Sequence, residues 1–318
     1  MQLTFWGAAG TVTGSAHLMT VNGVRVLLDC GLYQGRRDEA RRLNQEFPAP
    51  PPTISDVILS HAHLDHCGNL PVLVRQGFKG SVRCTHATAD LVKALLLDSG
   101  HIQEKDAEYL NRKKRRAGEP PVTPLYSLRD TEAVFARLKT AHYGRPFRAG
   151  NGAVTAVFRD AGHILGSAFV EMTVADGGPD GKKILFSGDL GRRNRPILRD
   201  PETPGEADIL ILESTYGNRC HRPADGAEER LLTAIRRVIE RRGKIVIPAF
   251  SIERTQELVY TLNKLWNERR LPRVPVYVDS PLATNVTEIF RAHAECLDDQ
   301  VQDLLRFDPD PFGFESLI

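Results

Sequence analysis

The stretch Ser60–Gly68, SHAHLDHCG, follows the apolar run Asp56–Leu59 and decides how the whole chain is interpreted. Three histidines and one aspartate fall within positions 61–66. From the histidine and aspartate content of this chain, the pattern H-x-H-x-D-H is expected by chance on the order of once per thousand or more such chains. We therefore interpret the stretch as a cluster of ligands at the end of a buried strand, rather than as capping and core histidines.

The spacing within the cluster has a physical meaning. On a strand or a tight loop alternate side chains share a face, so His61 and His63 can bind one ion. Asp65 and His66 come after the turn and can reach a second ion. Neutral imidazoles with a carboxylate suit zinc, with manganese or iron as alternatives. The stretch thus predicts a site for two metal ions.

Further candidate ligands follow other apolar runs, each beside small residues. Strand ends are where sheet proteins commonly build their sites. Each residue alone would also fit a turn or a cap, but together they predict one shared site. The four are Asp29 in LLDCG, His163 in DAGHILGS, Asp189 in FSGDLG and Glu213 in LILESTYG.

The composition sets the class of protein. A chain of 318 residues with 41% hydrophobic and 26% charged residues can bury a large core, and its net charge of +2 means that any polyanion site must be local. The five cysteines include no C-x-x-C pair, which indicates reduced thiols. No apolar run approaches the roughly 18 residues of a membrane span, and the start resembles no signal peptide. We expect a cytoplasmic globular protein without a membrane segment.

The pattern of apolar residues predicts strands that alternate with helices. The predicted strands of the first part are 3–6, 16–21, 24–28, 57–60, 82–85, 154–158, 168–174, 183–186 and 209–212, and its helices are 70–76, 87–116 and 131–140. From Ala227 onward we predict a helix, a strand at 244–247, a helix at 253–266 and a strand at 274–278. The basic run Asn111–Pro121 is interpreted first as a solvated helix end, with nucleic-acid contact as the alternative.

The motifs together resemble the metallo-β-lactamase superfamily. The resemblance rests on Asp29, HAHLDH, His163, Asp189 and Glu213, in that order. It implies an α/β fold, an αβ/βα sandwich with metals at the sheet edge. It assigns His61, His63 and His163 to one zinc ion, Asp65 and His66 to the other, Asp189 as the bridge between the two, and Asp29 as a residue that orients the ligands.

The later motifs GDLGRRNRPILRDP, LESTYGNR, IPAFSIERTQEL and VDSPLATNVTEIF resemble the β-CASP branch, which processes nucleic acids. The resemblance implies a metallo-β-lactamase domain over residues 1–212, a β-CASP cap domain over residues 213–318, and a substrate cleft between them. It also implies two further motif histidines. His293 in RAHAECL lacks the right surroundings, so we expect this sequence to be part of a longer chain.

By the same resemblance we expect a ribonuclease. Hydroxide held between two cations about 3.5–4 Å apart would attack the RNA phosphodiester. Asp65 and Asp189 would accept its proton, and Glu213 would support the acid histidine. Phosphate contacts are predicted at Arg192 and Arg193, and more weakly at Ser251, Arg254 and Ser280, for which plain caps or a surface arginine are the alternatives.

Several alternatives stay open at this point. We expect single-stranded RNA as the partner, two zinc ions per complete chain, and a homodimer as a further expectation. The alternatives are a DNA-processing enzyme, a hydrolase of small thioesters or lactones, and a non-catalytic RNA-binding subunit. The sequence does not separate endonuclease from 5′ exonuclease activity.

Overall fold

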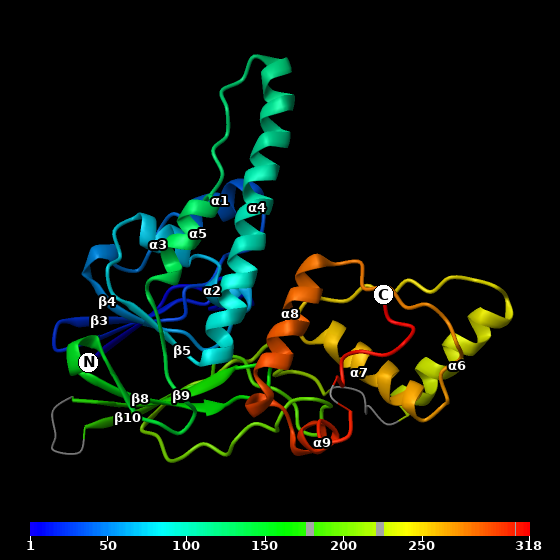
Figure 1. The fold of residues 1–318 in the computed structure, drawn as a ribbon. Helices are drawn as coiled ribbons and strands as arrows, with labels where there is room; N and C mark the ends of the chain where they lie inside the picture. Colours follow the sequence, from blue (N-terminus) through cyan, green and yellow to red (C-terminus); the bar gives the residue numbers. More distant parts are fainter. Residues whose placement is uncertain (176–180, 221–225, 309) are drawn as a thin grey trace. The chain divides into compact units, whose positions relative to one another are not determined.

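The computed structural model describes residues 1–175, 181–220, 226–308 and 310–318, except for the side chains of Arg116 and Ala117. The chain forms two compact units (Figure 1). Unit 1 comprises residues 1–192 and 200–213, and unit 2 comprises residues 193–199 and 214–318. The predicted domain extents, 1–212 and 213–318, stay a prediction, and residues 221–225 of the predicted boundary stretch lie outside the described residues.

A six-stranded sheet forms the first layer of unit 1. Its order is β1 (Gln2–Phe5), β2 (His17–Val21), β3 (Val24–Leu28), β4 (Ile54–Ile58), β5 (Ser81–Cys84) and β6 (Leu138–Thr140). The first three strands pair antiparallel and the last four pair parallel. Between β2 and β3, Asn22 and Gly23 have φ angles of 50° and 79°, as a two-residue hairpin turn requires. The predicted opening hairpins are confirmed.

A five-stranded sheet packs against the first. Its order is β11 (Ile209–Ile211), β10 (Lys182–Phe186), β9 (Ala168–Val174), β8 (Val154–Asp160) and β7 (Phe147–Ala149). Side chains from both sheets share one buried cluster, with Met19 and Ile58 from the first sheet and Phe158 and Val170 from the second. The core of unit 1 therefore lies between two sheets, and the predicted two-sheet α/β fold is confirmed.

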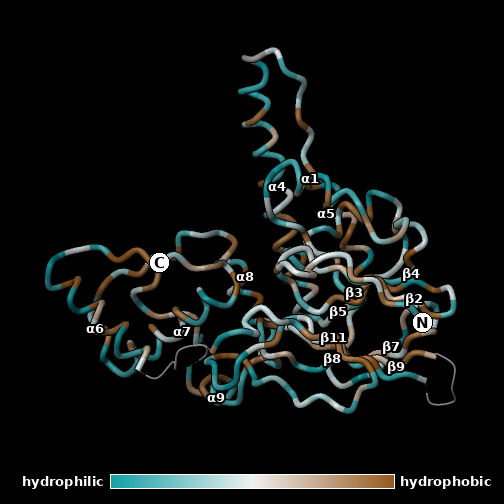
Figure 2. Tube along the Cα trace, turned by 180° about the vertical axis from the view of Figure 1, so that it is seen from behind, coloured by the Kyte–Doolittle hydropathy of each residue, from teal (hydrophilic) through white to brown (hydrophobic). Residues whose placement is uncertain are grey.

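The helices of unit 1 lie on the side of the first sheet (Figure 1). They are α1 (Arg37–Leu43), α2 (Leu64–Cys67), α3 (Leu70–Arg75), α4 (His86–Ala117) and α5 (Leu128–Phe135), with 3₁₀ turns η1 (Pro51–Thr53) and η2 (Gly150–Gly152). Figure 2 shows the sheets largely hydrophobic and the far end of α4 largely hydrophilic. Among the described residues, no helix has both the length and the hydropathy to cross a membrane.

One helix prediction in unit 1 is wrong. The segment 131–140 is not one helix, because α5 begins earlier and ends at Phe135, and β6 follows it. Ser127 and Asp130 form a capping box that starts α5, and Leu138 of β6 pairs with Val82 of β5. The capping box therefore sets where the helix begins, and the pairing with β5 makes residues 138–140 a strand, although the apolar pattern of 131–140 is that of a helix. In addition, α1 and β7 were not predicted from the sequence.

Unit 2 is built from helices around a small core. They are α6 (Ala227–Glu240), α7 (Arg254–Asn267), α8 (Pro281–Ala292), the 3₁₀ turn η3 (Ala294–Cys296) and α9 (Asp299–Leu304). The core contains Leu232, Ile235, Leu262, Leu265 and Leu271. The predicted helix 253–266 is confirmed as α7.

The two strands predicted in unit 2 are wrong. The described segment 244–247 forms no strand, and within 274–278 only Val276 makes an isolated bridge, to Leu317. A strand exists only where a neighbouring strand takes up its backbone N–H and C=O groups. Val246 is 89% exposed, so the apolar run has found no such partner among the described residues.

Glu253, directly before α7, is a strained and buried acid. Its φ of 67° lies in the left-handed region, and it is only 6% exposed. Both carboxylate oxygens lack a hydrogen-bond partner among the described residues. Burial, followed by the nearby Glu257, raises the pKa of Glu253 to about 8. The folded state therefore holds this side chain protonated at neutral pH.

This predicts an unusual pH dependence of stability. The unfolded chain loses the Glu253 proton near the ordinary glutamate pKa of 4.5, whereas the folded chain keeps it up to about pH 8. The free energy of unfolding should therefore fall as pH rises from about 4.5 to 8, by on the order of 5 kcal/mol at about 1.4 kcal/mol per pKa unit. Glu253→Gln should flatten this slope in thermal unfolding scans, and exposed Glu240→Gln should not. An unchanged slope in Glu253→Gln would contradict the assignment.

Candidate metal centre

The predicted ligands gather at one edge of the two sheets. Asp29 follows β3 and His61 follows β4, and these strands are parallel, so both residues lie at the same edge. His163, Asp189 and Glu213 follow β8, β10 and β11, which also run in one direction. The two edges are joined where the Ala168 N–H donates to the Ser60 carbonyl at 2.9 Å. All of these residues belong to unit 1.

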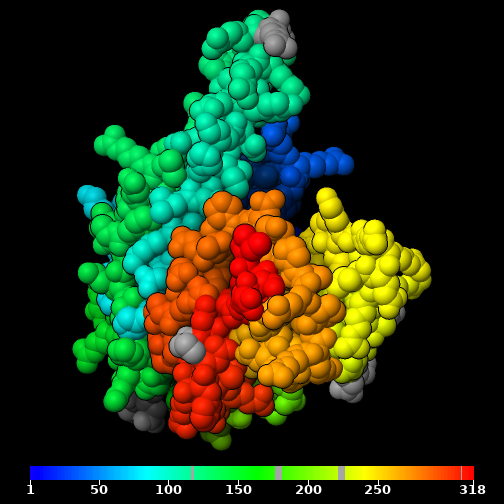
Figure 3. Space-filling view, turned by 45° about the vertical axis from the view of Figure 1, so that its right-hand side comes forward, coloured from blue at the N-terminus to red at the C-terminus, as the bar shows by residue number. Residues whose placement is uncertain are grey.

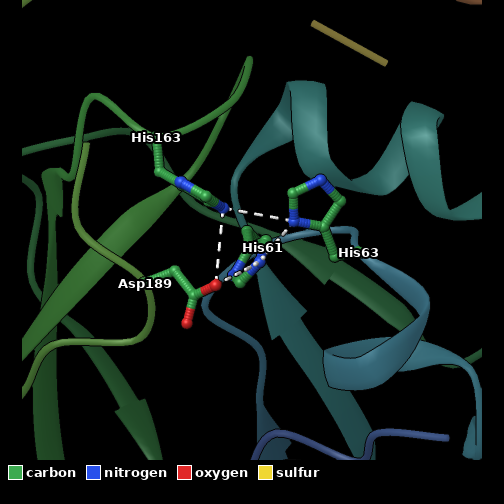
Figure 4. Close-up of side chains that lie close together, drawn as sticks. All are labelled: His61, His63, His163 and Asp189. Carbon is green, nitrogen blue, oxygen red and sulfur yellow. Dashed lines mark hydrogen bonds and ion pairs between the residues drawn. The ribbon is translucent and has the colours of Figure 1, made fainter. Parts of the chain in front are cut away.

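Four side chains converge on one point (Figure 4). The ligand-type atoms of His61, His63, His163 and Asp189 all lie within 4.8 Å of one another. Nδ1 of His63 is 3.0 Å from Nε2 of His61 and 3.2 Å from Nε2 of His163. The Asp189 Oδ2 atom lies 3.5 Å from His163 Nε2 and 3.9 Å from His61 Nε2.

These separations fit a tetrahedral metal ion. Nitrogen ligands about 2.0–2.1 Å from zinc lie about 3.3 Å apart in a tetrahedron, close to the distances found here. Burial, followed by the charge of His66, lowers the pKa of His63 to about 4 and that of His61 well below its usual value. Neutral imidazoles are the form that binds metals. The donor set therefore fits a divalent ion of the zinc type.

Hydrogen bonds to Asp29 fix the tautomer of His61. The Ser60 hydroxyl lies 3.0 Å from Asp29 Oδ2 and 2.9 Å from His61 Nδ1. Its single proton goes to the carboxylate, so it accepts from His61 Nδ1–H, and the lone pair of His61 Nε2 is left facing the cluster. The ring nitrogens His61 Nε2, His63 Nδ1 and His163 Nε2 therefore lie close together with too few protons to form a hydrogen bond between each contacting pair. A cation bound between them would remove the repulsion of their lone pairs.

A second group of donors lies beside the first. His66 donates Nδ1–H to Asp29 Oδ2 at 2.7 Å, which leaves Nε2 3.3 Å from Asp189 Oδ1 and 3.9 Å from Asp65 Oδ2. Burial alone would lower the pKa of His66, but Asp29 and Asp189 raise it well above its usual value. An ion bound at Nε2 therefore has to displace a proton. Asp189 offers one oxygen to each group.

The two acidic residues of the cluster differ in basicity. Burial raises the pKa of Asp65. Burial acts in the same direction on Asp189, but its hydrogen bond with His66 and the surrounding imidazoles lower the pKa of Asp189 to about 2. Asp189 is thus the permanently ionised carboxylate, and Asp65 is the more basic one.

Two glycines let the Asp189 loop approach its neighbours. A Cβ atom at Gly188, whose φ is 52°, would lie 2.5 Å from the Ser60 Cβ atom. A Cβ atom at Gly191 would lie 1.6 Å from the carbonyl oxygen of Gly162, next to His163. Both distances are far below any real contact, so larger side chains would push Asp189 away from the histidines.

Glu213 stands beside the cluster and not in it. Its Oε1 atom accepts a long hydrogen bond of 3.5 Å from the Leu190 N–H, next to Asp189. Its own N–H donates to the Ser187 hydroxyl at 3.0 Å. These contacts brace the loop that carries Asp189.

None of the five predicted phosphate contacts belongs to the four-residue cluster. Arg192 and Arg193 are exposed. Ser280 accepts from the Ala283 N–H at 3.1 Å and so caps α8, as the alternative interpretation held. Arg254 is 3.8 Å from Glu257, and the Ser251 carbonyl accepts from the Gln256 amide. Their roles stay predictions.

Sequence reasoning missed the serines that hold the ligands. Ser15 and Ser60 donate to Asp29, and Ser167 accepts from the His163 N–H at 3.0 Å. Serines at strand ends and turns are common, so the sequence carries no signal that separates these from ordinary turn residues. Only the folded arrangement identifies them.

Two stacked sheets with histidines and aspartates at one edge define a metallohydrolase-type fold and site. Residues 9–125 match the family model of the Metallo-beta-lactamase superfamily, and residues 255–318 match that of the Beta-Casp domain. The chain therefore combines a metallo-β-lactamase domain with a Beta-Casp domain, as its motifs predicted.

Curated relatives match along nearly the whole chain. "Ribonuclease TTHA0252" of Thermus thermophilus is 38% identical over 302 residues, which cover 95% of this chain and 63% of the relative. "Cleavage and polyadenylation specificity factor subunit 3" of Dictyostelium discoideum is 32% identical, with 100% of this chain and 39% of the relative covered. "Endoribonuclease ysh1" of Schizosaccharomyces pombe is 32% identical over 97% of this chain and 38% of its own length. The chain thus spans under two thirds of each.

A solved structure supports the fold. A protein of unknown function from Enterococcus faecalis V583 superimposes with a TM-score of 0.52 at 16% identity. The match covers 92% of this chain and 67% of that chain. It bears on the fold alone.

Ser60 offers a test of the site geometry. Ser60→Ala removes the hydroxyl that fixes the His61 tautomer, so metal affinity should fall about 10- to 100-fold, as expected for partners of metal ligands. Competition against a chelator, read by metal transfer, measures this without any substrate. The matched control is Ser81→Ala in β5, whose side chain makes none of the hydrogen bonds described above. Equal affinity of Ser60→Ala and wild type would contradict the proposed geometry.

Proposed function

We propose that this chain is the catalytic part of a zinc-dependent ribonuclease that hydrolyses phosphodiester bonds of single-stranded RNA during RNA processing or decay. The observation that carries the proposal is the convergence of His61, His63, His163 and Asp189 at one sheet edge. The names of the relatives, a ribonuclease, an endoribonuclease and a cleavage factor subunit, support RNA as the substrate class.

In the proposed site, His61, His63 and His163 would hold one ion, Asp65 and His66 would hold the other, and Asp189 would be available to both. When bound, the ions lower the pKa of a water molecule and neutralise charge that develops on the phosphate. The side chains of the protein have to accept the proton of the water, position the ligands and contact the phosphate.

Asp65 is the better candidate to accept the proton of the attacking water, because its raised pKa makes it the stronger base. Asp189, with a pKa of about 2, stays ionised and keeps its two oxygens available as ligands. Asp29 holds His66 and, through Ser60, His61 in the required tautomers. Glu213 keeps the Asp189 loop in position.

Arg192 and Arg193 are proposed phosphate contacts because they follow Asp189 closely in the chain and are exposed. Ser251, Arg254 and Ser280 remain weaker proposals, with capping and ion pairing as their described roles. We further propose a cytoplasmic location, which rests on the reduced-type cysteines, and a homodimer as the assembled form. The described cysteines form no disulfide.

Metal analysis combined with one ligand variant tests the function. The complete protein should contain two zinc ions per chain, and His63→Ala should abolish cleavage of labelled single-stranded RNA and lower the zinc content. The exposed His101→Ala in α4 is the matched control and should keep both. Full cleavage by a metal-free preparation would disprove the mechanism.

The same assay separates the alternatives. Labelled RNA, labelled DNA and a generic thioester are offered to the same preparation. Cleavage of RNA with at most slow cleavage of the others is expected. Preferred cleavage of DNA or thioester would assign another hydrolase class, and RNA binding without any cleavage would indicate a non-catalytic subunit.

A further inference from the structure

The far end of α4 carries a dense positive charge that the metal centre does not use. The helix is 32 residues long, and Arg112, Lys113, Lys114 and Arg115 follow one another near its end. Figure 3 shows this end, with the segment that follows it, projecting from the body of unit 1. The net charge of the whole chain is only +2, so this cluster, which we call the basic tip, is a local feature.

The basic tip is braced. The side-chain amide of Asn111 donates to the Val122 carbonyl at 2.9 Å and accepts from the Val122 N–H at 2.7 Å. Gly118 ends the helix in a left-handed conformation, with a φ of 70°, and Lys114 pairs with Glu119 at 3.0 Å. The segment 119–125, which we call the returning segment, is thereby tied to the helix. A merely solvated helix end needs no such support, so the bracing indicates a fixed surface.

The helix dipole does not account for the charges. Its effect falls off within the last turn, whereas Arg112 and Lys113 lie before that turn. Arg112 and Arg115 are exposed and make no ion pair with any described residue. Their guanidinium groups are therefore available for a partner.

An exposed aromatic ring accompanies the charges. Tyr109 is 50% exposed, and the Lys113 ammonium lies 4.5 Å from the centre of its ring. An aromatic face among arginines and lysines is what single-stranded nucleic acids bind, since bases stack on the ring and phosphates pair with the cations. An acidic protein segment would use the charges but not the ring.

Positive groups continue from the basic tip toward α1. A hollow of about 260 Å³ lies between α1, α4 and the returning segment, and Arg37, Arg41 and Leu110 are among its lining residues. Arg41 is held in place there, since it donates to the carbonyl and the hydroxyl of Thr123. A strand on the basic tip would thus find two further cations on α1, whereas the charged residue of α4 that lines the hollow is the acid Asp106.

The start of α4 adjoins the metal centre. The hydroxyls of Thr85 and Thr88 both donate to the carbonyl of Gly166, which lies three residues after His163. At about 1.5 Å per residue, Arg112 lies about 39 Å along the helix from His86. A stacked strand at about 3.4 Å per nucleotide needs about 12 nucleotides to span this distance.

We propose that the basic tip of α4 is a second RNA-binding surface, which holds the substrate strand about a dozen nucleotides away from the metal centre. This rests on RNA being the substrate, as proposed above. The tip adds affinity only for RNA long enough to reach it.

Binding of labelled RNA by the complete protein, without metal to prevent cleavage, tests the proposal. The double variant Arg112→Glu/Arg115→Glu should bind single-stranded RNA of 30 nucleotides about tenfold more weakly and leave binding of a 6-nucleotide RNA unchanged. Each phosphate contact contributes about 0.7 to the slope of log K against log salt concentration for single-strand binding. Loss of two contacts in the double variant should therefore make this slope shallower by about 1.4 for the 30-nucleotide RNA. Tyr109→Ala should also weaken binding of the long RNA, and Tyr109→Phe should not.

The matched control reverses two exposed charges elsewhere in unit 1, Lys139→Glu/Arg148→Glu, with the same change in net charge. It should bind as wild type does. Equal loss in this control, or unchanged binding by the tip variant, would overturn the proposal. Equally tight binding of polyglutamate at the tip would overturn its assignment to RNA. If wild type cleaves no RNA when metal is restored, the proposed function fails instead, whatever the tip variant shows.

Discussion

The buried carboxylate of Asp29 is the constraint on which the metal centre depends. It is 0% exposed, and a charge so far from water has to be surrounded by donors. Those donors are the Ser60 N–H, the Ser60 and Ser15 hydroxyls, and His66 Nδ1–H. Because Ser60 in turn receives His61 Nδ1–H, one carboxylate sets the ring orientation in both groups of ligands. The backbone φ of 59° at Asp29 directs its side chain toward these donors. Aspartate tolerates this left-handed conformation better than most residues.

The ligands come from both sheets, so packing of the core and assembly of the site are the same event. His61 and His63 follow a strand of the first sheet, and His163 and Asp189 follow strands of the second. The shared core between Met19, Ile58, Phe158 and Val170 fixes the distance between the two edges. The site is therefore preorganised by a large apolar interface, and a core substitution that shifts one sheet against the other would separate its ligands.

The sequence predicted the parts of this structure that local patterns encode. The strands before Asp29, His61, His163 and Asp189 are apolar runs that end in small or polar residues, and such runs are recognisable without tertiary information. The serines around Asp29 were not predicted, because their role depends on which strand ends meet. The segment 131–140 was misassigned because the Ser127 cap and the pairing with β5 override its helical pattern. The segment 244–247 has a strand pattern, but a pattern cannot supply the hydrogen-bonding neighbour that a strand needs.

Helix α4 shows how one element can serve two different demands. Its first half carries side chains such as Leu91, Val92 and Leu96, which are fully buried, so this half belongs to the core. Its second half is largely exposed, and beyond Ala107 none of its described side chains is buried, so burial does not explain why the helix continues for several turns. In the proposed ribonuclease function, the chemistry would involve only the few atoms around the metal centre, and these are the same in every RNA. Selection of a long strand over a short one has to come from contacts remote from the reacting phosphate, where binding energy can be gained without altering the site. Helix α4 starts beside the His163 loop, and its basic end lies about 39 Å further along. For the proposed RNA substrate this basic end meets that requirement, and the metal ligands cannot.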